Sequence, residues 1–283
     1  MLDRVALSST QLWHFRLADV LRMAADLGYN GVEVWAEHVW QRADDPEAVR
    51  RLAESLGLSL TVHAASWDLN LAAINRGIRE QSCREVERSM DLAAQLGAGL
   101  VTVHPGRASF TMENIDQHWA WLVESLRRLA AVAAERGVRL AVENMEPIRK
   151  EFINWPTDVN RLLDEVGDPR VGCTYDIAHV ALERSAVECF QQLDRVVLVH
   201  LSDADGTALH RPLGRGTIDL PAIVRFLRNH YDGWIVLEGY WAKPNDWLAW
   251  WNKAVFDGLA RAQEEAQKGD VHADRPARSL YSI

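Results

Sequence analysis

The feature that most constrains the fold of this chain is a regular alternation of short apolar runs with longer amphipathic segments. Eight runs rich in valine, isoleucine and leucine recur, each of a length suited to a strand. They are VALSS (5–9), GVEVW (31–35), LSLTVHA (58–64), GLVTVH (99–104), VRLAVEN (138–144), RVGCTYD (170–176), RVVLVHLSD (195–203) and GWIVLEGY (233–240). Strands that are apolar almost throughout are typical of a parallel sheet buried on both faces.

The segments between these runs have the residue spacing of helices. Several end in glycine just before the next run, as in LGLSLTV and RGVRLAV, and glycine suits the left-handed residue that ends a helix. Prolines near the expected helix starts fit the first turn, where a backbone N–H is not needed. The residues concerned are Trp119, Leu122, Leu126, Leu129 and Ala133 on one apolar face, Val86, Met90 and Ala93 on another, and the prolines Pro46, Pro156 and Pro221.

Eight strand–helix units within about 250 residues predict an α/β fold, a single closed (β/α)₈ TIM barrel. The rival is an open doubly wound sheet, which calls for a glycine-rich turn after the first strand, and SSTQLWHF is not such a turn. We expect one catalytic domain over residues 1–266. Residues 267–283 form a polar, aperiodic tail that is expected to be flexible or to pack on a partner subunit.

Composition narrows the class of partner and the compartment. The formal net charge of -9 argues against a nucleic-acid partner, because binding of phosphates needs a basic surface. No stretch approaches the roughly 18 apolar residues of a membrane span, and the N-terminus does not resemble a signal peptide. The three cysteines have spacings that form neither a disulfide framework nor a metal clip. We therefore expect a soluble cytoplasmic protein.

Acidic and histidine side chains recur at the ends of the predicted strands, which in such a barrel meet at one mouth. Carboxylates crowded into one dry mouth repel each other, and a bound cation relieves this. Three carboxylates and one imidazole suit one divalent ion, with Mn²⁺ as the first choice and Mg²⁺, Co²⁺ or Zn²⁺ open. The strand-end residues are Glu33, His63, His104, Glu143, Asp176 with His179, His200 with Asp203, and Glu238, and the predicted ligands are Glu143, Asp176, His200 and Glu238.

The segments VENM, YDIAH, VHLSDADG, HRPLGRGTIDL and VLEGY resemble the sugar isomerase/epimerase superfamily with a xylose-isomerase-like barrel. The resemblance covers about residues 1–260 and extends to ketose 3-epimerases, inosose isomerases, dehydratases and abasic-site nucleases of the endonuclease IV type. It implies that the four residues just named bind the metal. It also implies that Glu143 and Glu238 act as an acid/base pair, and that His179 contacts a substrate oxygen.

This constellation predicts proton transfer beside a carbonyl group through a metal-stabilised enediolate. The substrate class is a keto-sugar, a cyclitol or a related polyol. Return of the proton to the same carbon gives epimerisation, return to the neighbouring carbon gives isomerisation, and loss of a β-hydroxyl makes the protein a lyase or dehydratase. The sequence does not decide between epimerisation, isomerisation and dehydration.

Further residues are candidates for contact with the substrate. Aromatic faces suit the C–H face of a sugar, and we expect at least one of these tryptophans to contact the substrate, although each taken singly is better explained by core or loop packing. Arg211 or Arg215, in the turn after the seventh strand, either holds a carboxylate, phosphate or sugar oxygen or is simply solvated, and the turn LGRG is expected to bring backbone amides close to the site. The predicted substrate contacts are His63, His104, His179, His210, Arg211, Trp35 and Trp67, and Trp13 and Trp241 also lie near strand ends.

An abasic-site nuclease with three zinc ions is the alternative that shares most of these residues. Its ligand pattern places an aspartate two residues before the histidine that aligns with His210, and Ala208 stands there. The acidic net charge also opposes it, so no nucleic-acid partner is expected. A barrel that binds without turnover is a third reading. The aromatic last helix makes a homodimer or homotetramer reasonable.

Overall fold

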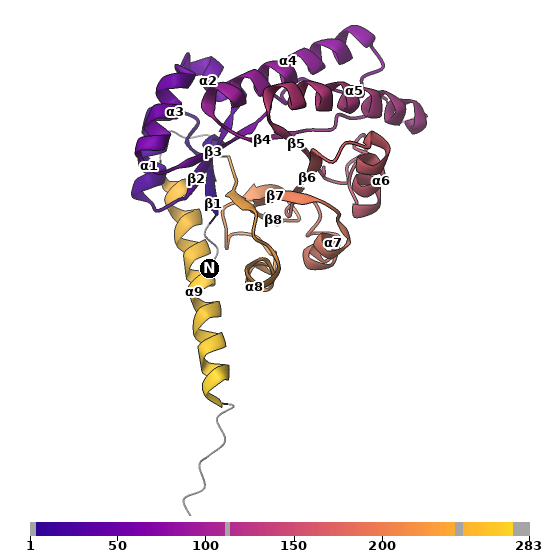
Figure 1. The fold of residues 1–283 in the computed structure, drawn as a ribbon. Helices are drawn as coiled ribbons and strands as arrows, with labels where there is room; N and C mark the ends of the chain where they lie inside the picture. The colour runs from indigo at the N-terminus through magenta and orange to yellow at the C-terminus, as the bar shows by residue number, and fades with distance from the viewer. Residues whose placement is uncertain (1–3, 111–113, 241–245, 274–283) are drawn as a thin grey trace, which may run out of the picture.

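The computed structural model describes residues 4–110, 114–240 and 246–273, and its centre is a closed barrel of eight parallel strands (Figure 1). Neighbouring strands follow the order of the chain, and the last strand closes on the first through the pair Val5 and Ile235. All eight apolar runs are strands, so the predicted (β/α)₈ barrel is confirmed. The strands are β1 (Val5–Ser8), β2 (Gly31–Trp35), β3 (Ser59–His63), β4 (Leu100–Val103), β5 (Arg139–Glu143), β6 (Val171–Asp176), β7 (Val196–Leu201) and β10 (Trp234–Leu237).

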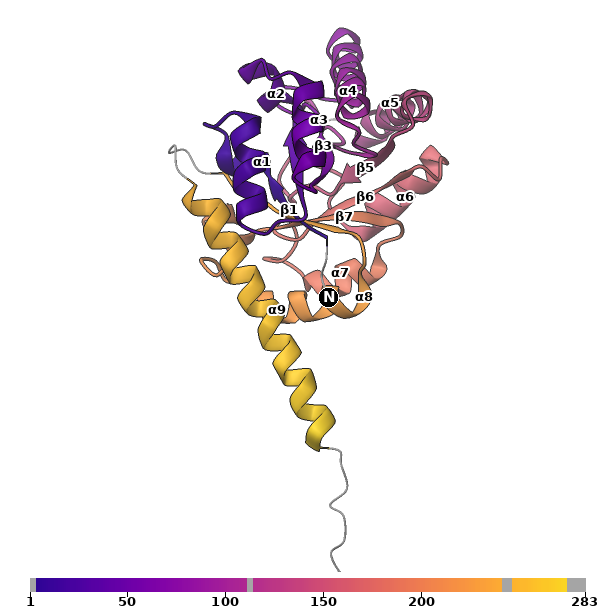
Figure 2. The ribbon, with the colours of Figure 1, turned by 60° about the vertical axis from the view of Figure 1, so that its left-hand side comes forward.

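Helices surround the barrel, and their ends carry the signals expected from the sequence (Figures 1 and 2). The Asp219 side chain accepts a hydrogen bond from the Ala222 N–H at 3.1 Å and caps its helix. Gly97 and Gly137, with φ of 70° and 68°, end two others in the left-handed conformation. The helices are α1 (Leu17–Asp26), α2 (Ala36–Arg42), α3 (Pro46–Ser55), α4 (Arg76–Leu96), α5 (Ile115–Arg136), α6 (Pro156–Val166), α7 (Ala186–Gln192), α8 (Leu220–His230) and α9 (Trp247–Ala273), with a 3₁₀ turn at Ser9–Leu12.

The main core lies between the strands and the helices, while a smaller one fills the amino-terminal end of the barrel. Successive strand residues point to opposite sides, so Leu7 and Val199 pack in the main core and Ala6 and Leu198 in the smaller one. The predicted apolar faces of α4 and α5 are buried. In β5, β7 and β10 the inward-facing row therefore begins with apolar residues and reaches polar ones nearer the carboxyl end of the strand, as in Ala141 and Glu143, Leu198 and His200, and Val236 and Glu238.

One element, and the length of another, were not predicted from the sequence. An antiparallel hairpin, β8 (Asp203–Asp205) and β9 (Ala208–Arg211), follows β7. Helix α9 continues to Ala273, so the tail expected from residue 267 begins inside this helix, whose far half extends away from the barrel in both views. In the described part of the chain, no helix has the length and apolar character needed to cross a membrane.

Candidate metal centre and active site

Four ionisable side chains converge at the carboxyl ends of the strands because of the alternation along each strand. Val142 of β5 packs toward the helices, so Glu143, one residue further on, points into the barrel. The same alternation turns Asp176, His200 and Glu238 inward, and the register of β6 and β7 sets Asp176 beside His200. We call Glu143, Asp176, His200 and Glu238 the quartet.

His200 lies at the centre of the quartet. Its Nδ1 lies 3.1 Å from Glu143 Oε1 and 3.2 Å from Glu238 Oε2, and 3.9 Å from Asp176 Oδ2. Each of the four residues offers one ligand atom within 4.8 Å of the others, and all four are buried. The structure thus brings together the four residues named as ligands from the sequence.

The charges inside the quartet hold one another in unusual ionisation states. Burial would raise the pKa of Glu143 and Glu238, but the positive charge of His200 outweighs it, leaving the pKa of Glu143 well below its ordinary value and lowering that of Glu238 to about 2. Burial raises the pKa of Asp176. Burial would lower the pKa of His200, but Glu33 and Glu238 hold it well above the ordinary value.

Glu33 lies on the side of the His200 ring that faces away from the other quartet members. It is fully buried, and its Oε2 and Oε1 lie 3.1 and 3.2 Å from His200 Nε2. The hydroxyl of Thr102 donates to Glu33 Oε1 at 3.3 Å and is within 3.0 Å of the hydroxyl of Thr174. A carboxylate at this nitrogen keeps a proton on Nε2 and turns Nδ1 toward the quartet, the orientation that a ligating imidazole needs.

Two further pairs of imidazoles flank the quartet. His63 Nε2 and His104 Nε2 lie 3.4 and 3.2 Å from Glu143 Oε2. Across the site, the Nε2 atoms of His179 and His210 are 3.2 Å apart, and both residues lie near Asp176. Burial would lower the pKa of His179, but the neighbouring Asp176 raises it to about 9. By residue type, each pair together with its carboxylate forms another group that could hold an ion.

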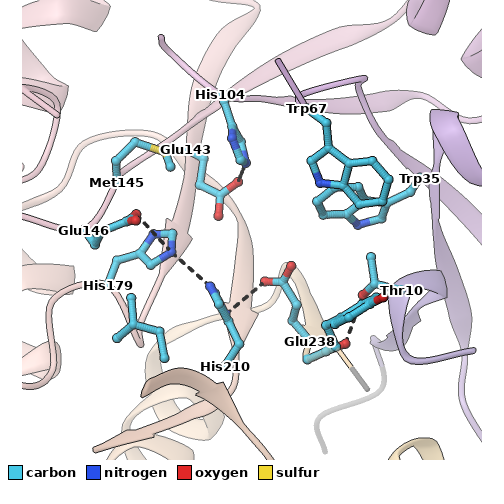
Figure 3. Close-up of a pocket in the computed structure, with 13 residues that line it drawn as sticks. Thr10, Trp35, Trp67, His104, Glu143, Met145, Glu146, His179, His210 and Glu238 are labelled. Carbon is cyan, nitrogen blue, oxygen red and sulfur yellow. Dashed lines mark hydrogen bonds and ion pairs between the residues drawn. The ribbon is translucent and has the colours of Figure 1, made fainter. Parts of the chain in front are cut away.

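A cavity of about 540 Å³ opens in front of the quartet (Figure 3). Figure 3 shows Trp35 and Trp67 on one side, with Met145, Glu146 and His179 opposite them. Trp35 stacks on the imidazole of His63, with ring centroids 3.9 Å apart and planes inclined by 8°. The cavity therefore has flat apolar faces on one side and hydrogen-bonding groups on the other. This is the composition that suits a polyhydroxylated ligand.

The predicted substrate contacts divide into two sets. His104, His179, His210, Trp35 and Trp67 line the cavity, together with Glu143 and Glu238 of the quartet. His63 is fully buried beneath Trp35, and Arg211 is not part of the lining. Trp241 lies outside the described residues.

The loop after β7 differs from the expectation for Arg211 and the turn LGRG. The Arg211 guanidinium lies 2.5 Å from Asp205 and donates to the Thr207 hydroxyl at 2.6 Å, so it braces the β8–β9 hairpin. Asp203 accepts the backbone N–H groups of Gly214 and Gly216 at 3.0 and 2.8 Å, so these amides bind a carboxylate of the chain and not a ligand. A Cβ atom at Gly216 would lie 2.3 Å from Asp203 Oδ1, which explains why the turn needs glycine there.

Sequence reasoning missed several residues that line the cavity. Met145 and Glu146 come two and three residues after Glu143, and Leu209 precedes His210, so proximity to a predicted site residue was the available signal. Asn144 was also overlooked: its Oδ1 accepts the Asp176 N–H at 2.8 Å, which ties β5 to β6 next to the quartet. The missed lining residues are Thr10, Met145, Glu146, Leu209, Gly239 and Tyr240.

The quartet fits a divalent cation on the chemistry of its donors. Asp176 Oδ2 is a buried oxygen without a hydrogen-bond partner among the described residues, and Glu238 Oε2, although 3.2 Å from His200 Nδ1, makes no hydrogen bond of acceptable geometry there; both lie within the quartet. A buried carboxylate oxygen with no partner is costly, and coordination of a cation removes that cost. Three carboxylates and one imidazole form a set suited to a hard or borderline divalent ion.

The fold and the site together define a class: a TIM barrel with a carboxylate–histidine site at the carboxyl ends of its strands. Comparison of the chain with protein families agrees, because the family described as "Xylose isomerase-like TIM barrel" matches residues 21–264. The chain belongs to this family. The superfamily resemblance drawn from the sequence is thereby confirmed.

Individual relatives carry sugar-epimerase names. The chain is 26% identical to the fructoselysine 3-epimerase of Escherichia coli O157:H7, over 77% of this chain and 83% of the relative. It is 24% identical to the 3-dehydro-D-guloside 4-epimerase of Escherichia coli K12, over 79% of this chain and 87% of the relative. A crystal structure of a D-tagatose 3-epimerase-like protein superposes with a TM-score of 0.81 at 20% identity, covering 95% of this chain and 99% of that one.

Proposed function

We propose that this protein is a divalent-metal-dependent isomerase or epimerase that acts on a keto-sugar, a cyclitol or a related polyol. The observation that carries the proposal is the convergence of three carboxylates and one imidazole beside a cavity with aromatic walls and imidazole donors. The named relatives support it, since two of them are a fructoselysine 3-epimerase and a 3-dehydro-D-guloside 4-epimerase.

In this proposal the quartet holds one ion. Mn²⁺ is the first candidate because an oxygen-rich set tolerates six ligands, with Mg²⁺, Co²⁺ and Zn²⁺ as the alternatives. When bound, the ion polarises a substrate carbonyl and stabilises the negative charge that develops on its oxygen. Glu33 orients His200, and Asn144 fixes the backbone of Asp176, so that the donors are held in place before the substrate arrives.

Glu143 and Glu238 are the proton carriers of the proposal. Both line the cavity, Glu143 as the last residue of β5 and Glu238 as the residue directly after β10, and Figure 3 shows them among the lining residues. One takes the proton from the carbon beside the carbonyl, and the other delivers a proton to the opposite face of that carbon, which inverts it. Delivery to the neighbouring carbon would give isomerisation, and loss of a hydroxyl group would give dehydration.

The remaining lining residues bind and orient the sugar. His104, His179 and His210 present ring nitrogens to its hydroxyl groups, while Trp35 and Trp67 cover its C–H face and exclude water from the reacting carbon. His63 acts indirectly, through its stacking contact with Trp35 and its contact with Glu143.

Exchange of hydrogen with solvent tests the proposal. Protein loaded with Mn²⁺ is incubated in D₂O with a panel of ketohexoses and inososes, and deuterium beside the carbonyl is measured by NMR. We expect one deuterium per turnover in at least one sugar. Protein stripped with a chelator should give none, and Mn²⁺ should restore it. Absence of exchange from the whole panel, with the metal present, contradicts the proposal.

An abasic-site nuclease is the second candidate, because three groups of residues could each hold an ion. Ala208, which stands where the nuclease pattern has an aspartate, and the net charge of -9 oppose it. Metal analysis together with incubation with an abasic-site oligonucleotide separates the two. We expect one ion per chain and no cleavage. Three zinc ions with cleavage would favour the nuclease.

A further inference from the structure

A second cavity of about 360 Å³ adjoins the cavity in front of the quartet. The two cavities share three lining residues, Glu146, His179 and Leu209, and so meet at a common neck. No member of the quartet lines the second cavity. If the carbonyl group of a sugar faces the quartet, the second cavity is therefore left free for a substituent attached to that sugar.

The walls of the second cavity are largely apolar. They come from the loop after β5, the turn after β6 and the β8–β9 hairpin. Ile148 and Leu182, on two of these segments, are 56% and 42% exposed. Exposed apolar side chains that face one cavity suit an aliphatic group, which would cover them.

The charged residues of the second cavity are mostly acidic. Glu146, Glu183 and Asp205 line it, and among the described residues neither lysine nor arginine does. The one basic side chain of the described lining is His179, whose Nε2 lies 3.7 Å from Glu146 Oε2 and offsets that carboxylate. Arg211 already neutralises Asp205, while Glu183 has no ion pair with any residue that the structure describes. The lining therefore favours a positively charged group near Glu183 and opposes a phosphate or carboxylate.

We propose that the substrate is a keto-sugar with an aliphatic substituent that ends in an amine. The sugar lies against the quartet, the aliphatic part lies between Ile148 and Leu182, and the ammonium group lies beside Glu183. The inference rests on the proposed keto-sugar chemistry and narrows it to conjugated sugars, excluding phosphorylated ones.

Matched probes test the charge and the stem. The parent ketohexose is compared with ethers of the same sugar that carry a 5-aminopentyl or a 4-carboxybutyl arm, at C1 in one series and at C6 in another. Deuterium exchange beside the carbonyl gives kcat/KM for each. In one of the two series we expect kcat/KM for the sugar with the amine arm to be about tenfold higher than for the parent sugar, because its aliphatic stem is buried. We expect it to be about fivefold higher than for the sugar with the carboxylate arm, because only the ammonium group is attracted by Glu183.

Two variants locate the arm. Glu183→Lys reverses the charge at an exposed position and should abolish the preference for the amine arm over the carboxylate arm. Glu188→Lys, with the same change of charge at an exposed residue of α7 outside both cavities, is the control and should keep it. Leu182→Trp narrows the cavity and should lower the ratio of kcat/KM between the amine-bearing and parent sugars by about tenfold.

The outcomes distinguish a failure of the proposed amine-bearing substrate from a failure of the proposed isomerase or epimerase function. Exchange in no probe contradicts the proposed function. Exchange at equal rates for the amine, carboxylate and parent sugars contradicts only the inference, and so does a preference that survives Glu183→Lys. A preference for the amine that Glu183→Lys removes and Glu188→Lys retains supports it.

Discussion

The floor of the active site and its rim are built in different ways. The floor comprises Glu33 and the quartet, which lie on or directly after barrel strands and are buried. The rim comprises Trp67, Leu209, His210, Arg211 and Tyr240, which lie on loops or the β8–β9 hairpin and are partly exposed. Hydrogen-bonded register fixes the floor, whereas each rim residue depends on its own loop.

The two regions also treat carboxylates differently. In the floor, Glu143 and Glu238 face imidazoles that keep them ionised in spite of burial. In the loop after β5, burial and the neighbouring Glu146 raise the pKa of Glu151 to about 7. The glutamates of the floor are thus kept ionised by neighbouring imidazoles, whereas Glu151 lies beside another acid and its charged form is disfavoured.

The largest effect is expected from the proton carriers of the floor. Glu143→Gln and Glu238→Gln should each lower turnover by about 10²–10⁴-fold, because each removes an acid/base group. Measurement of kcat together with metal content tells loss of proton transfer from loss of the ion. The glutamate that remains in each variant should still exchange the carbon-bound proton of one epimer with solvent, although that epimer is not converted into the other. Full activity in either one would remove that residue from the mechanism.

The next effect concerns Glu33, which is not among the described residues that line the cavity. Glu33→Gln keeps the shape of the side chain but removes the charge facing His200 Nε2, so affinity for Mn²⁺ should fall about 10–100-fold. Calorimetric titration of the metal-free protein measures it without any need for activity. Thr102→Val removes only the hydroxyl that donates to Glu33 and should cause a smaller loss. An unchanged dissociation constant in Glu33→Gln would show that His200 needs no partner.

The floor could be predicted from the sequence, and the reason is physical. Strand side chains alternate with a period of two, and all carboxyl ends of a parallel barrel meet at one mouth. It is therefore enough to recognise a strand that ends in Glu143, and another in Asp176, to expect the two to converge. What the sequence did not indicate was the role of Glu33, because facing His200 is a relation between β2 and β7 across the barrel.

The rim could be predicted only in part. His210 was named, but the hairpin that carries it was not, although Gly206 and Thr207 between short strands are a readable hairpin signal. The hairpin holds His210 at a φ of 53°, a left-handed conformation that is uncommon for any residue other than glycine and that the sequence does not announce. Arg211 was expected at the substrate but pairs with Asp205, because a nearby carboxylate of the same hairpin competes for it.

A rim residue should change binding more than chemistry. Trp67 is 46% exposed and packs near Trp13 and Trp35, with ring centroids 4.9 and 5.9 Å away. Trp67→Ala should raise KM by about fivefold and leave kcat nearly unchanged, since the indole covers the sugar without touching the reacting atoms. Trp250→Ala, an exposed tryptophan on α9, is the control. A fall in kcat as large as that of Glu143→Gln would end the distinction between floor and rim.

The smallest expected effect is a pH dependence of folding stability that differs between Glu143 in the floor and Glu151 in the loop after β5. The pKa of Glu151 is raised by burial and by Glu146 to about 7. The folded state therefore holds a proton there that the unfolded chain has lost above its ordinary pKa, and stability falls as pH rises from about 5 through 7. Glu151→Gln should stabilise the protein by about 1–2 kcal/mol at pH 8, a value reduced for partial exposure, and by nearly nothing at pH 4.

Urea unfolding of the metal-free protein at pH 4, 6 and 8 measures this difference, with Glu188→Gln on exposed α7 as the control for loss of one charge. Glu143→Gln should behave in the opposite way: its carboxylate is stabilised by His200, so its removal costs most above the ordinary pKa of a glutamate and least below it. If the change in unfolding free energy followed the same course with pH in both variants, Glu143 and Glu151 would be held by the same electrostatic forces, and the proposed difference between them would be wrong.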